Sequence, residues 1–408
     1  MRVSGSDAFS LAERMSGRAV EPGRISLRTL SSPDGRVIDE AVLLAFRAPR
    51  SYTGEDVVEF QCHGGSVTPR RVLEACYAQG ARPARRGEFT ERAFLNGRLD
   101  YSQAESVLNL VDAKTARAAD SALEGLSGRR RRETSEVYAL ALDLSSTIEH
   151  ALDVDEGELG DDFFGGIRRK AAALSERLSA AIRRVREGRI LRDGALVVLA
   201  GAPNAGKSSL LNALLDESRA IVSDTPGTTR DSIEAWIDLD GWPVRLVDTA
   251  GLRTSDDAIE AEGVRRAEEL IERADVVLAL DCETQAANGC VLRLHAKCDL
   301  GRGEGINVSS KTGEGLEELK RAVVSRLEAM SDASSADAAD ASVGEESLAA
   351  YVDAKALVEG IASGEGAFDL VLAANDVRSA AERLGAAVGA TYSADLLDRL
   401  FSRFCVGK

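Results

Sequence analysis

The stretch Gly201-Ala202-Pro203-Asn204-Ala205-Gly206-Lys207-Ser208 decides the fold of this chain, because it fits the phosphate-binding pattern G-x-x-x-x-G-K-[ST]. The apolar run 195–200 before it is typical of a buried parallel strand, and residues 209–215 after it have helical composition. In such a strand–loop–helix arrangement, backbone N–H groups and the helix N-terminus converge on phosphate oxygens. Lys207 would reach the terminal phosphates and the Ser208 hydroxyl would bind Mg2+, so the stretch predicts a nucleotide site.

Length and composition narrow the possible functions. The 408 residues suffice for two or three domains, and a formal net charge of −16 argues against nucleic-acid binding by bulk electrostatics. The basic run Arg129–Arg132 could contact RNA, but a solvated helix face is the simpler interpretation. The six cysteines lack zinc-ligand spacing, and no apolar run approaches the ~18 residues of a membrane span. We therefore expect a soluble, cytoplasmic protein with reduced cysteines and no membrane association.

Composition divides the chain into four segments: 1–97, 98–193, 194–331 and 332–408. Short strand-like runs in the first segment predict an α/β domain, and helical periodicity in the second predicts the first half of a helical domain. Alternating strands and helices in the third segment are typical of a parallel sheet with helices on both faces. The fourth combines a linker with further helices. The simplest assembly inserts the nucleotide-binding domain between two halves of one helical domain.

Several local signals refine the helical parts. The spacing of Ser102 and Glu105 predicts a capping box at the start of a long helical segment. An apolar stripe at three- and four-residue steps from Ile167 to Val185 predicts one long amphipathic helix. Residues Ser331 to Glu346 are rich in Ala, Ser, Asp and Gly, a composition that predicts a linker.

The remaining parts of a GTPase follow the phosphate-binding stretch in the expected order. A strand ending at Asp248 leads into Asp248-Thr249-Ala250-Gly251, which has the D-x-x-G pattern. Asp248 would hold Mg2+ through water, and the Gly251 N–H would sense the γ-phosphate. Between the two motifs, Gly227-Thr228-Thr229 is a candidate switch loop whose Thr229 hydroxyl can complete the Mg2+ shell.

A further element predicts the choice of base. Ala296-Lys297-Cys298-Asp299 resembles an N-K-x-D element in which alanine replaces the asparagine, while Ser309-Ser310-Lys311 matches an S-A-K element. The Asp299 carboxylate can accept hydrogen bonds from guanine N1–H and the exocyclic amine, so we expect guanine over adenine. Only residues 281–290 separate the two preceding strands, fewer than the dozen or so that a helical crossover usually takes, so a helix is expected to be missing there.

The whole chain resembles the MnmE (TrmE) family of tRNA-modification GTPases. The resemblance rests on residues 53–65 (TGEDVVEFQCHGG), residues 87–96 (GEFTERAFLN) and the terminal Phe404-Cys405-Val406-Gly407-Lys408, as well as on the GTPase motifs. It implies an N-terminal α/β folate-binding-like domain and a helical domain interrupted by an inserted Ras-like P-loop GTPase domain. It also implies a homodimer that works with a flavin-dependent MnmG partner, as a heterotetramer, to place a carboxymethylaminomethyl-type group on the wobble uridine of certain tRNAs.

The resemblance assigns further residues to GTP hydrolysis. Asn204, Ser223, Thr225 and Thr228 match ligands of a K+ ion, which can do the electrostatic work of an arginine finger. Glu260, nine residues beyond Gly251, matches the glutamate that orients the attacking water, and Glu262 is its local competitor. The residues expected around GTP and its cations are Asn204, Ala205, Gly206, Lys207, Ser208, Ser209, Ser223, Asp224, Thr225, Pro226, Gly227, Thr228, Thr229, Asp248, Thr249, Ala250, Gly251, Lys297, Asp299, Ser309, Ser310 and Lys311.

The resemblance also implies a site for a 5-formyl- or 5,10-methylene-tetrahydrofolate. Arg2, Glu59, Arg98 and Lys408 match the contact positions, with Arg98 standing where lysine is often found. Residues 1–5 look like the end of the family's first strand segment, so we expect the N-terminal domain to lack the strand-turn before it. Cys405 is a candidate nucleophile toward uridine or, equally, a packed residue at a helix end. Lys207, Glu260 and Cys405 are thus the candidate catalytic residues.

Two other functions compete with this interpretation. A ribosome-assembly GTPase of the Era/Der type would carry a dedicated basic RNA-binding domain, which the acidic composition argues against. A degenerate scaffold that binds nucleotide without turnover is suggested by Ala296 and the short crossover. A comparison of GTP turnover in K+ and Na+ buffers separates this scaffold from the K+-stimulated GTPase.

Overall fold

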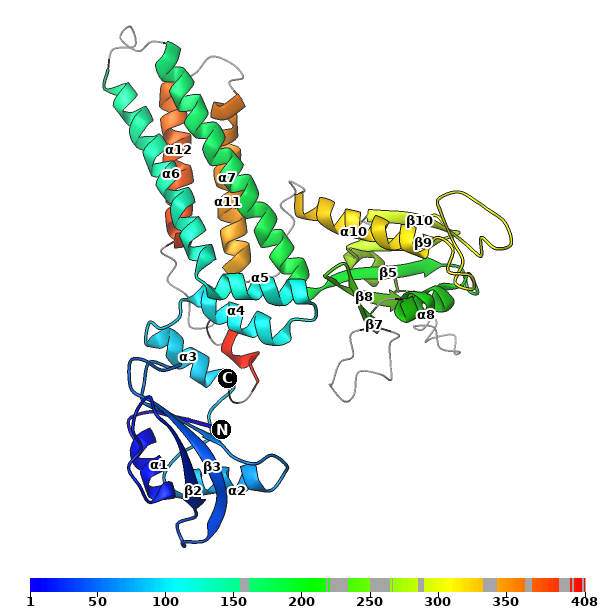
Figure 1. Cartoon of the computed structure of the whole chain (residues 1–408). Helices are drawn as coiled ribbons and strands as arrows, with labels where there is room; N and C mark the ends of the chain where they lie inside the picture. Colours follow the sequence, from blue (N-terminus) through cyan, green and yellow to red (C-terminus); the bar gives the residue numbers. More distant parts are fainter. Residues whose placement is uncertain are drawn as a thin grey trace. The chain divides into compact units, whose positions relative to one another are not determined.

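The chain forms two compact units, each of which is described by itself (Figure 1). The computed structural model describes residues 1–154, 161–217, 219–220, 234–249, 265, 267–284, 290–332, 343–363, 369–388, 397, 400–405 and 407. The first unit comprises residues 1–108, 125–128 and 391–408, and the second comprises residues 109–124 and 129–390. The C-terminal tail therefore belongs to the same unit as the N-terminal domain.

An antiparallel four-stranded sheet organises the first unit. Its order is β1-β4-β3-β2, and the elements are β1 (Arg2–Ser4), α1 (Ala8–Ser16), β2 (Ile25–Ser31), β3 (Val37–Phe46), β4 (Val57–Gln61), α2 (Thr68–Ala78), α3 (Glu88–Leu95) and α4 (Tyr101–Asp112). Helices α1 and α2 pack on one sheet face, where Leu30, Leu43 and Phe60 are fully buried. The segment expected to be the end of a strand does form a strand, β1, which pairs with β4.

Helix α4 begins with a capping box, but not the predicted one. The Asp100 carboxylate accepts a hydrogen bond from the Gln103 backbone N–H at 2.9 Å, and Gln103 Oε1 accepts one from the Asp100 N–H at 2.9 Å. The prediction of Ser102 and Glu105 was therefore wrong by two residues. Asp100 satisfies the same side-chain and spacing rule as Ser102, and an aspartate caps as well as a serine.

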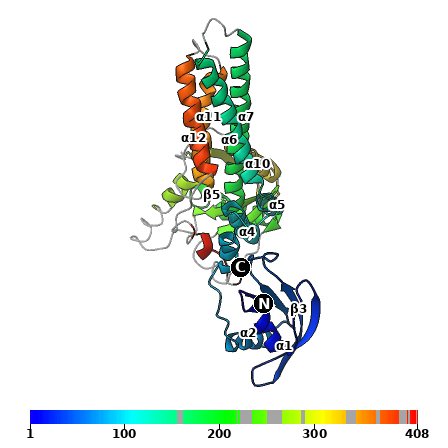
Figure 2. The same ribbon diagram turned by 90° about the vertical axis from the view of Figure 1, so that its left-hand side faces the viewer.

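Four long helices from both sides of the nucleotide-binding domain share one core in the second unit. They are α6 (Arg129–Leu152), α7 (Asp161–Asp193), α11 (Val343–Ser363) and α12 (Leu370–Val388), and they run alongside one another in Figures 1 and 2. The predicted stripe of α7 lies in this core from Ile167 to Ile182, with Val185 packed against it. The predicted insertion of the GTPase domain into a helical domain is thus confirmed.

The GTPase domain is built on a seven-stranded sheet in the order β11-β10-β9-β5-β8-β7-β6. Its elements are β5 (Ala195–Gly201), α8 (Lys207–Glu217), β6 (Arg219–Ala220), β7 (Glu234–Leu239), β8 (Trp242–Asp248), β9 (Val276–Leu280), β10 (Cys290–Ala296), β11 (Ile306–Val308) and α10 (Leu316–Asp332). Strands β5, β8, β9, β10 and β11 pair in parallel. A short helix, α5 (Ala116–Leu126), precedes α6.

The predicted parallel sheet continues at one edge with two antiparallel strands. Strand β7 pairs antiparallel with β8, and β6 pairs antiparallel with β7. The reason is the tight turn at Asp240-Gly241 between β7 and β8, where both residues have positive φ values of 48° and 85°. A two-residue turn of this kind joins antiparallel neighbours and cannot make a parallel crossover.

Central strand β5 is buried on both faces, which explains its continuous apolar sequence. Ala195, Val197 and Leu199 face one core, while Leu196, Val198 and Ala200 face a smaller core on the other side.

Both ends of the predicted linker, residues 331–346, are helical. Ser331 and Asp332 are the last residues of α10, and α11 begins at Val343. Residues 333–342 lie outside the described part of the chain.

Candidate functional site

The phosphate-binding loop follows strand β5 directly, at the carboxyl end of the parallel sheet. Gly201 has a φ of 156°, and a Cβ placed on it would lie 2.8 Å from the Leu280 carbonyl oxygen. Asn204 and Gly206 have positive φ values of 63° and 102°, and helix α8 begins directly afterwards at Lys207. The loop therefore turns sharply between strand and helix, as the predicted phosphate-binding motif requires.

Lys207 lies inside this loop. Its side chain is buried, with 4% exposure, and its Nζ donates hydrogen bonds at 2.9 Å to the carbonyl oxygens of Gly201 and Ala202. An ammonium group held against loop carbonyls at a helix N-terminus forms a positive site suited to phosphate oxygens.

Two oxygen donors suited to a divalent cation meet beside the loop. The Ser208 hydroxyl donates to the Asp248 carboxylate at 2.5 Å, and Asp248 is 1% exposed. The neighbouring Thr249 hydroxyl donates to the Leu199 carbonyl oxygen at 2.8 Å, which ties the end of β8 to β5. A hydroxyl and a carboxylate are ligands that Mg2+ accepts, so the predicted pair fits this ion.

The predicted base-reading elements also lie in this domain. Ser309, which is buried, donates from its hydroxyl to Asp299 Oδ1 at 2.7 Å and so orients the carboxylate, while Asp299 itself is exposed. Lys297 Nζ donates to the Asn204 carbonyl oxygen at 3.2 Å. The structure thus joins the base-reading loop directly to the phosphate-binding loop. Ser310 and Lys311 are exposed beside them.

The following residues of the predicted site lie outside the described part of the chain: Ser223, Asp224, Thr225, Pro226, Gly227, Thr228, Thr229, Ala250, Gly251, Glu260 and Lys408.

In the first unit, two of the four candidate folate residues meet. Arg2 and Glu59 stand opposite each other in the β1–β4 register and form an ion pair at 2.7 Å. The Arg2 guanidinium also lies over the rings of Tyr52 and Phe89, at 4.8 and 5.4 Å from their centroids. Arg98 is exposed. An arginine stacked on aromatic rings and fixed by a carboxylate can bind a planar, anionic ligand.

Cys405 is the exposed cysteine among the six. Burial raises the pKa of the Cys76 thiol to about 11, which leaves Cys76 inert. The preceding Phe401 and Phe404 are buried, so the tail is anchored by its aromatic residues rather than by the thiol. The packed-residue interpretation of Cys405 is therefore not supported, although exposure alone does not make a thiol reactive.

Sequence reasoning missed two residues that hold the base-reading loop in place, Asp281 and His295. Asp281 follows β9 and accepts hydrogen bonds from His295 and from the Ala296 backbone N–H. The available signal was the position of Asp281 at the carboxyl end of a parallel strand, where ligand-binding residues gather. The role of His295 depends on its neighbours in space, and no spacing in the sequence indicates it.

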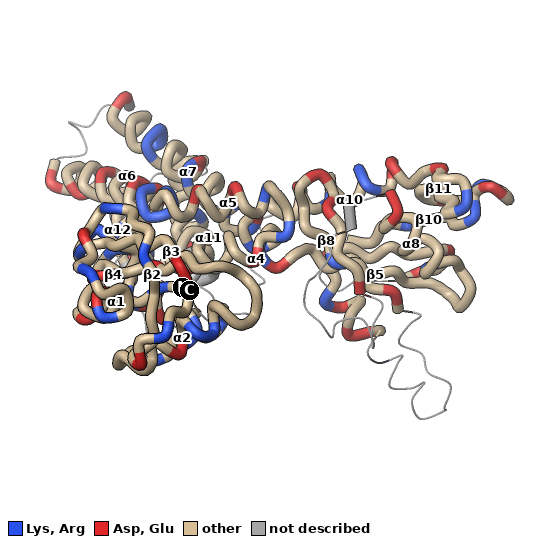
Figure 3. Tube along the Cα trace, turned by 60° about the horizontal axis from the view of Figure 1, so that its bottom comes forward, with Lys and Arg blue, Asp and Glu red and all other residues tan. Residues whose placement is uncertain are grey.

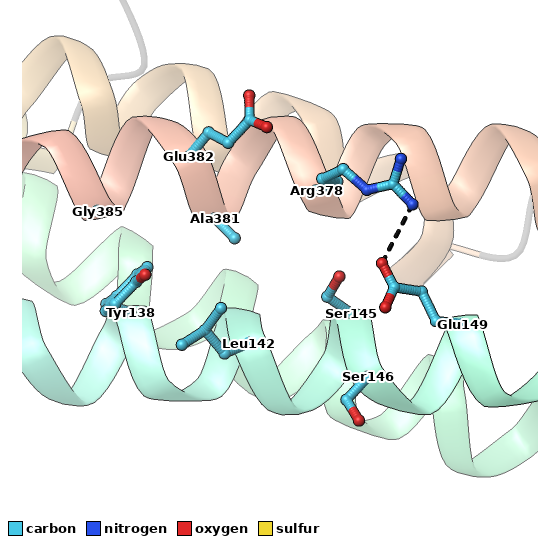
Figure 4. Close-up of a pocket in the computed structure, with 9 residues that line it drawn as sticks. All are labelled: Tyr138, Leu142, Ser145, Ser146, Glu149, Arg378, Ala381, Glu382 and Gly385. Carbon is cyan, nitrogen blue, oxygen red and sulfur yellow. Dashed lines mark hydrogen bonds and ion pairs between the residues drawn. The ribbon is translucent and has the colours of Figure 1, made fainter.

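The helical bundle carries an open groove between α6 and α12 (Figure 4). Tyr138, Leu142 and Ser145 line one side, and Arg378 from the other side forms an ion pair with Glu149 at 3.1 Å.

Acidic and basic residues are interspersed along the chain (Figure 3). Arg129, the first residue of the predicted basic run, pairs with Glu124 and Glu133 at 2.7 and 2.8 Å, which favours the helix-face interpretation of that run.

Comparisons with known proteins decide the family. The family model for the GTP-binding protein TrmE N-terminus matches residues 1–98, and the model for the MnmE helical domain matches residues 101–405. The chain belongs to the MnmE (TrmE) family of tRNA modification GTPases. The tRNA modification GTPase MnmE of Methylorubrum populi is 42% identical, with coverage of 100% of this chain and 94% of the relative.

Two further comparisons concern a second relative and a solved structure. The MnmE of Symbiobacterium thermophilum is 40% identical and covers 100% of this chain and 96% of its own length. A crystal structure of Aquifex aeolicus Era aligns with a TM-score of 0.26 and 22% identity, over 32% of this chain and 56% of that chain. In the described residues, no helix is both long and apolar enough to cross a membrane.

Proposed function

We propose that this chain is a K+-stimulated GTPase that modifies the wobble uridine of certain tRNAs together with a flavin-dependent MnmG partner. The family supports GTP hydrolysis in tRNA modification over the ribosome-assembly and scaffold alternatives. The observation that carries the proposal is the hydrogen bond from Lys297 to the Asn204 carbonyl oxygen, which links the base-reading loop to the phosphate-binding loop.

The cations follow from the ligands that the site offers. Ser208 and Asp248 fit Mg2+, with Thr229 as a further proposed ligand. Asn204 is exposed at the loop, and it would bind K+ together with Ser223, Thr225 and Thr228. A monovalent cation beside the β- and γ-phosphates would stabilise the negative charge that develops during hydrolysis.

Dimerisation through the N-terminal domain is supported by an uncovered apolar surface. Ile25 and Leu27 on edge strand β2 are 70% and 58% exposed, and they face away from the core that α1 and α2 cover. Their partners in the sheet register are Leu44 and Val42, so four apolar side chains share this outer face. A long, exposed apolar edge strand is a surface that a second copy can cover.

We also propose that Arg2, Glu59, Arg98 and Lys408 bind a tetrahydrofolate that supplies the one-carbon unit, with Cys405 as the nucleophile candidate. Arg2 is already positioned by Glu59 and two aromatic rings. We propose, separately, that the domains meet at residues 97, 193 and 331.

Two measurements test the proposed function. We expect GTP turnover by the full chain to be at least about tenfold faster in KCl than in NaCl, because K+ would stabilise the negative charge that develops in the transition state. Equal turnover in the two salts would contradict the K+ assignment. Mass spectrometry of wobble uridines in a deletion strain should show loss of the carboxymethylaminomethyl-type group, with recovery on re-expression of this chain.

A further inference from the structure

The guanine-reading loop is held at its first end by a carboxylate from a neighbouring strand. Asp281 follows β9 directly, and its backbone N–H donates to the Leu294 carbonyl oxygen of β10 at 3.0 Å. Its side chain bonds twice to the end of β10: Oδ1 lies 2.7 Å from His295 Nδ1, and Oδ2 accepts from the Ala296 N–H at 3.2 Å. One carboxylate therefore fixes the residue pair that precedes Lys297.

The imidazole of His295 continues this connection to the other end of the loop. Its Nε2 lies 3.0 Å from the Gly301 carbonyl oxygen, just beyond Asp299 and Leu300. A carboxylate and a carbonyl oxygen are both acceptors, so a protonated ring donates to both and a neutral ring donates to one of them. Asp281 at the end of β9, His295 near the end of β10 and Gly301 beyond the loop are thus connected through one imidazole ring.

The backbone conformation of the loop between these ends requires support from neighbouring residues. Ala296 offers no side-chain hydrogen bond, Lys297 has a positive φ of 59°, and Leu300 is 82% exposed. A non-glycine residue in the left-handed region costs free energy unless its surroundings hold it there. The support must come from groups outside the four residues of the A-K-C-D element.

A glycine keeps room for the bridging ring. A Cβ placed on Gly303 would lie 2.5 Å from His295 Nδ1 and 2.6 Å from its Cγ, closer than any real contact allows. Gly303 does not have a positive φ. The backbone at Gly303 would therefore accept alanine, and the added Cβ would displace the His295 ring.

The geometry points to Asp281 and His295 as positioning residues that set guanine selectivity, by holding the A-K-C-D loop so that the Asp299 carboxylate faces the base. This inference rests on the proposed assignment of Asp299 as the guanine-reading residue. His295 acts through the loop and does not itself touch the nucleotide's reacting atoms. Its loss should therefore weaken base recognition and leave the hydrolysis step largely unchanged.

The test compares GTP with inosine triphosphate (ITP), which lacks the exocyclic amine, using the full-length chain in KCl and MgCl2. We expect His295→Ala to raise the KM for GTP about tenfold, the scale of one charge-assisted hydrogen bond, while kcat stays within about twofold. The KM for ITP should rise less, so that the preference for GTP shrinks. The matched control is His63→Ala, because His63 makes a similar bond to Asp39 at 2.8 Å in the other unit.

Gly303→Ala supplies a second, independent variant. It should reproduce the higher GTP KM although His295 is still present, and it should add little to His295→Ala, because both changes remove the same contact. The unfolding temperature of each nucleotide-free variant is measured in parallel. Equal rises in the KM for GTP and ITP, accompanied by a lower unfolding temperature, would show a merely structural role and overturn the inference.

Asp299→Asn separates this inference from the proposed function. If Asp299→Asn abolishes guanine selectivity while His295→Ala and Gly303→Ala leave the KM for GTP within about twofold of the unchanged protein, the positioning role is wrong and the base site stands. If Asp299→Asn leaves the selectivity intact, the base-site assignment is wrong, and the role of Asp281 and His295 fails with it.

Discussion

The nucleotide site and the candidate folate site are built in different ways. In the GTPase domain, residues 201–208 form one continuous segment from the end of β5 to the first turn of α8, so the positions of Lys207 and Ser208 follow from the backbone of that segment. In the N-terminal domain, Arg2 and Glu59 are far apart in the chain and meet because β1 pairs with β4. The first site can be recognised from consecutive residues, whereas the second depends on strand register.

This difference has an energetic counterpart. A phosphate-binding loop presents backbone N–H groups, which most side-chain substitutions leave in place. The Arg2 site consists of an ion pair and two ring contacts, so its geometry is lost when one side chain is removed. We therefore expect substitutions in the GTPase domain to change the rate or the choice of nucleotide, and those in the N-terminal domain to change ligand binding or stability.

The largest expected effect concerns Glu260. Glu260→Ala should lower single-turnover GTP hydrolysis in KCl by about two to three decades, because the group that orients the attacking water is lost. GTP affinity should change little, since the side chain acts on the nucleophile rather than on the bound ground state. Glu262→Ala is the control and should be nearly silent. If Glu262→Ala is the slow variant the two roles are exchanged, and if neither is slow another group positions the water.

The next effect in size concerns the choice of base. Asp299→Asn should weaken GTP binding on the order of a hundredfold, because an amide cannot accept both guanine hydrogen bonds. Competition between GTP and ATP, followed by hydrolysis, measures the change. Asp376→Asn in the helical bundle is the matched control. Unchanged competition in Asp299→Asn would show that Asp299 is misassigned.

Acid stability of the N-terminal domain should depend on Glu88. Hydrogen bonds from Arg82, the Arg85 backbone N–H and Arg92 hold the pKa of this buried carboxyl at about 2, below its usual value of 4.5. Its contribution, about 2 kcal/mol after allowance for exposed partners, is present above pH ~4.5 and is lost as the pH falls toward 2.

Glu88→Gln should therefore destabilise the domain at pH 7 but hardly at pH 2. Hydrogen exchange of peptides from β3 and α3, compared with the unchanged protein at each pH, measures this difference. Glu21→Gln is the control, because Glu21 pairs with Arg24 on the surface at 66% exposure. A constant difference between pH 7 and pH 2 would contradict the assigned role of Glu88.

The smallest effect is expected at the candidate folate site. Arg2→Ala should weaken binding of 5-formyl-tetrahydrofolate about tenfold, because one charge-assisted contact and its aromatic stacking are removed. Isothermal titration calorimetry gives the affinity. Arg24→Ala in the same domain changes an exposed arginine and should bind folate normally. Equal affinity in both variants would remove Arg2 from the site.

The sequence by itself determined the parts of this protein that consecutive residues specify. The strand, loop and helix around residues 195–217, the long apolar stripe of α7 and the insertion of the GTPase domain were all predicted correctly. Each depends on local periodicity or on a backbone turn, and both are properties of neighbours in the chain. The capping box was misplaced because Asp100-x-x-Gln103 and Ser102-x-x-Glu105 satisfy the same rule. The ends of the predicted linker are helical although their composition is typical of a linker.

Only the tertiary structure decided which distant residues meet. The antiparallel edge of the GTPase sheet depends on the tight turn at Asp240-Gly241, which composition alone did not single out. The register of β1 against β4 places Arg2 beside Glu59, and the parallel pairing of β9 with β10 places Asp281 beside His295. Hydrogen bonds between side chains depend on separations of about 3 Å in space, which distance along the chain does not determine.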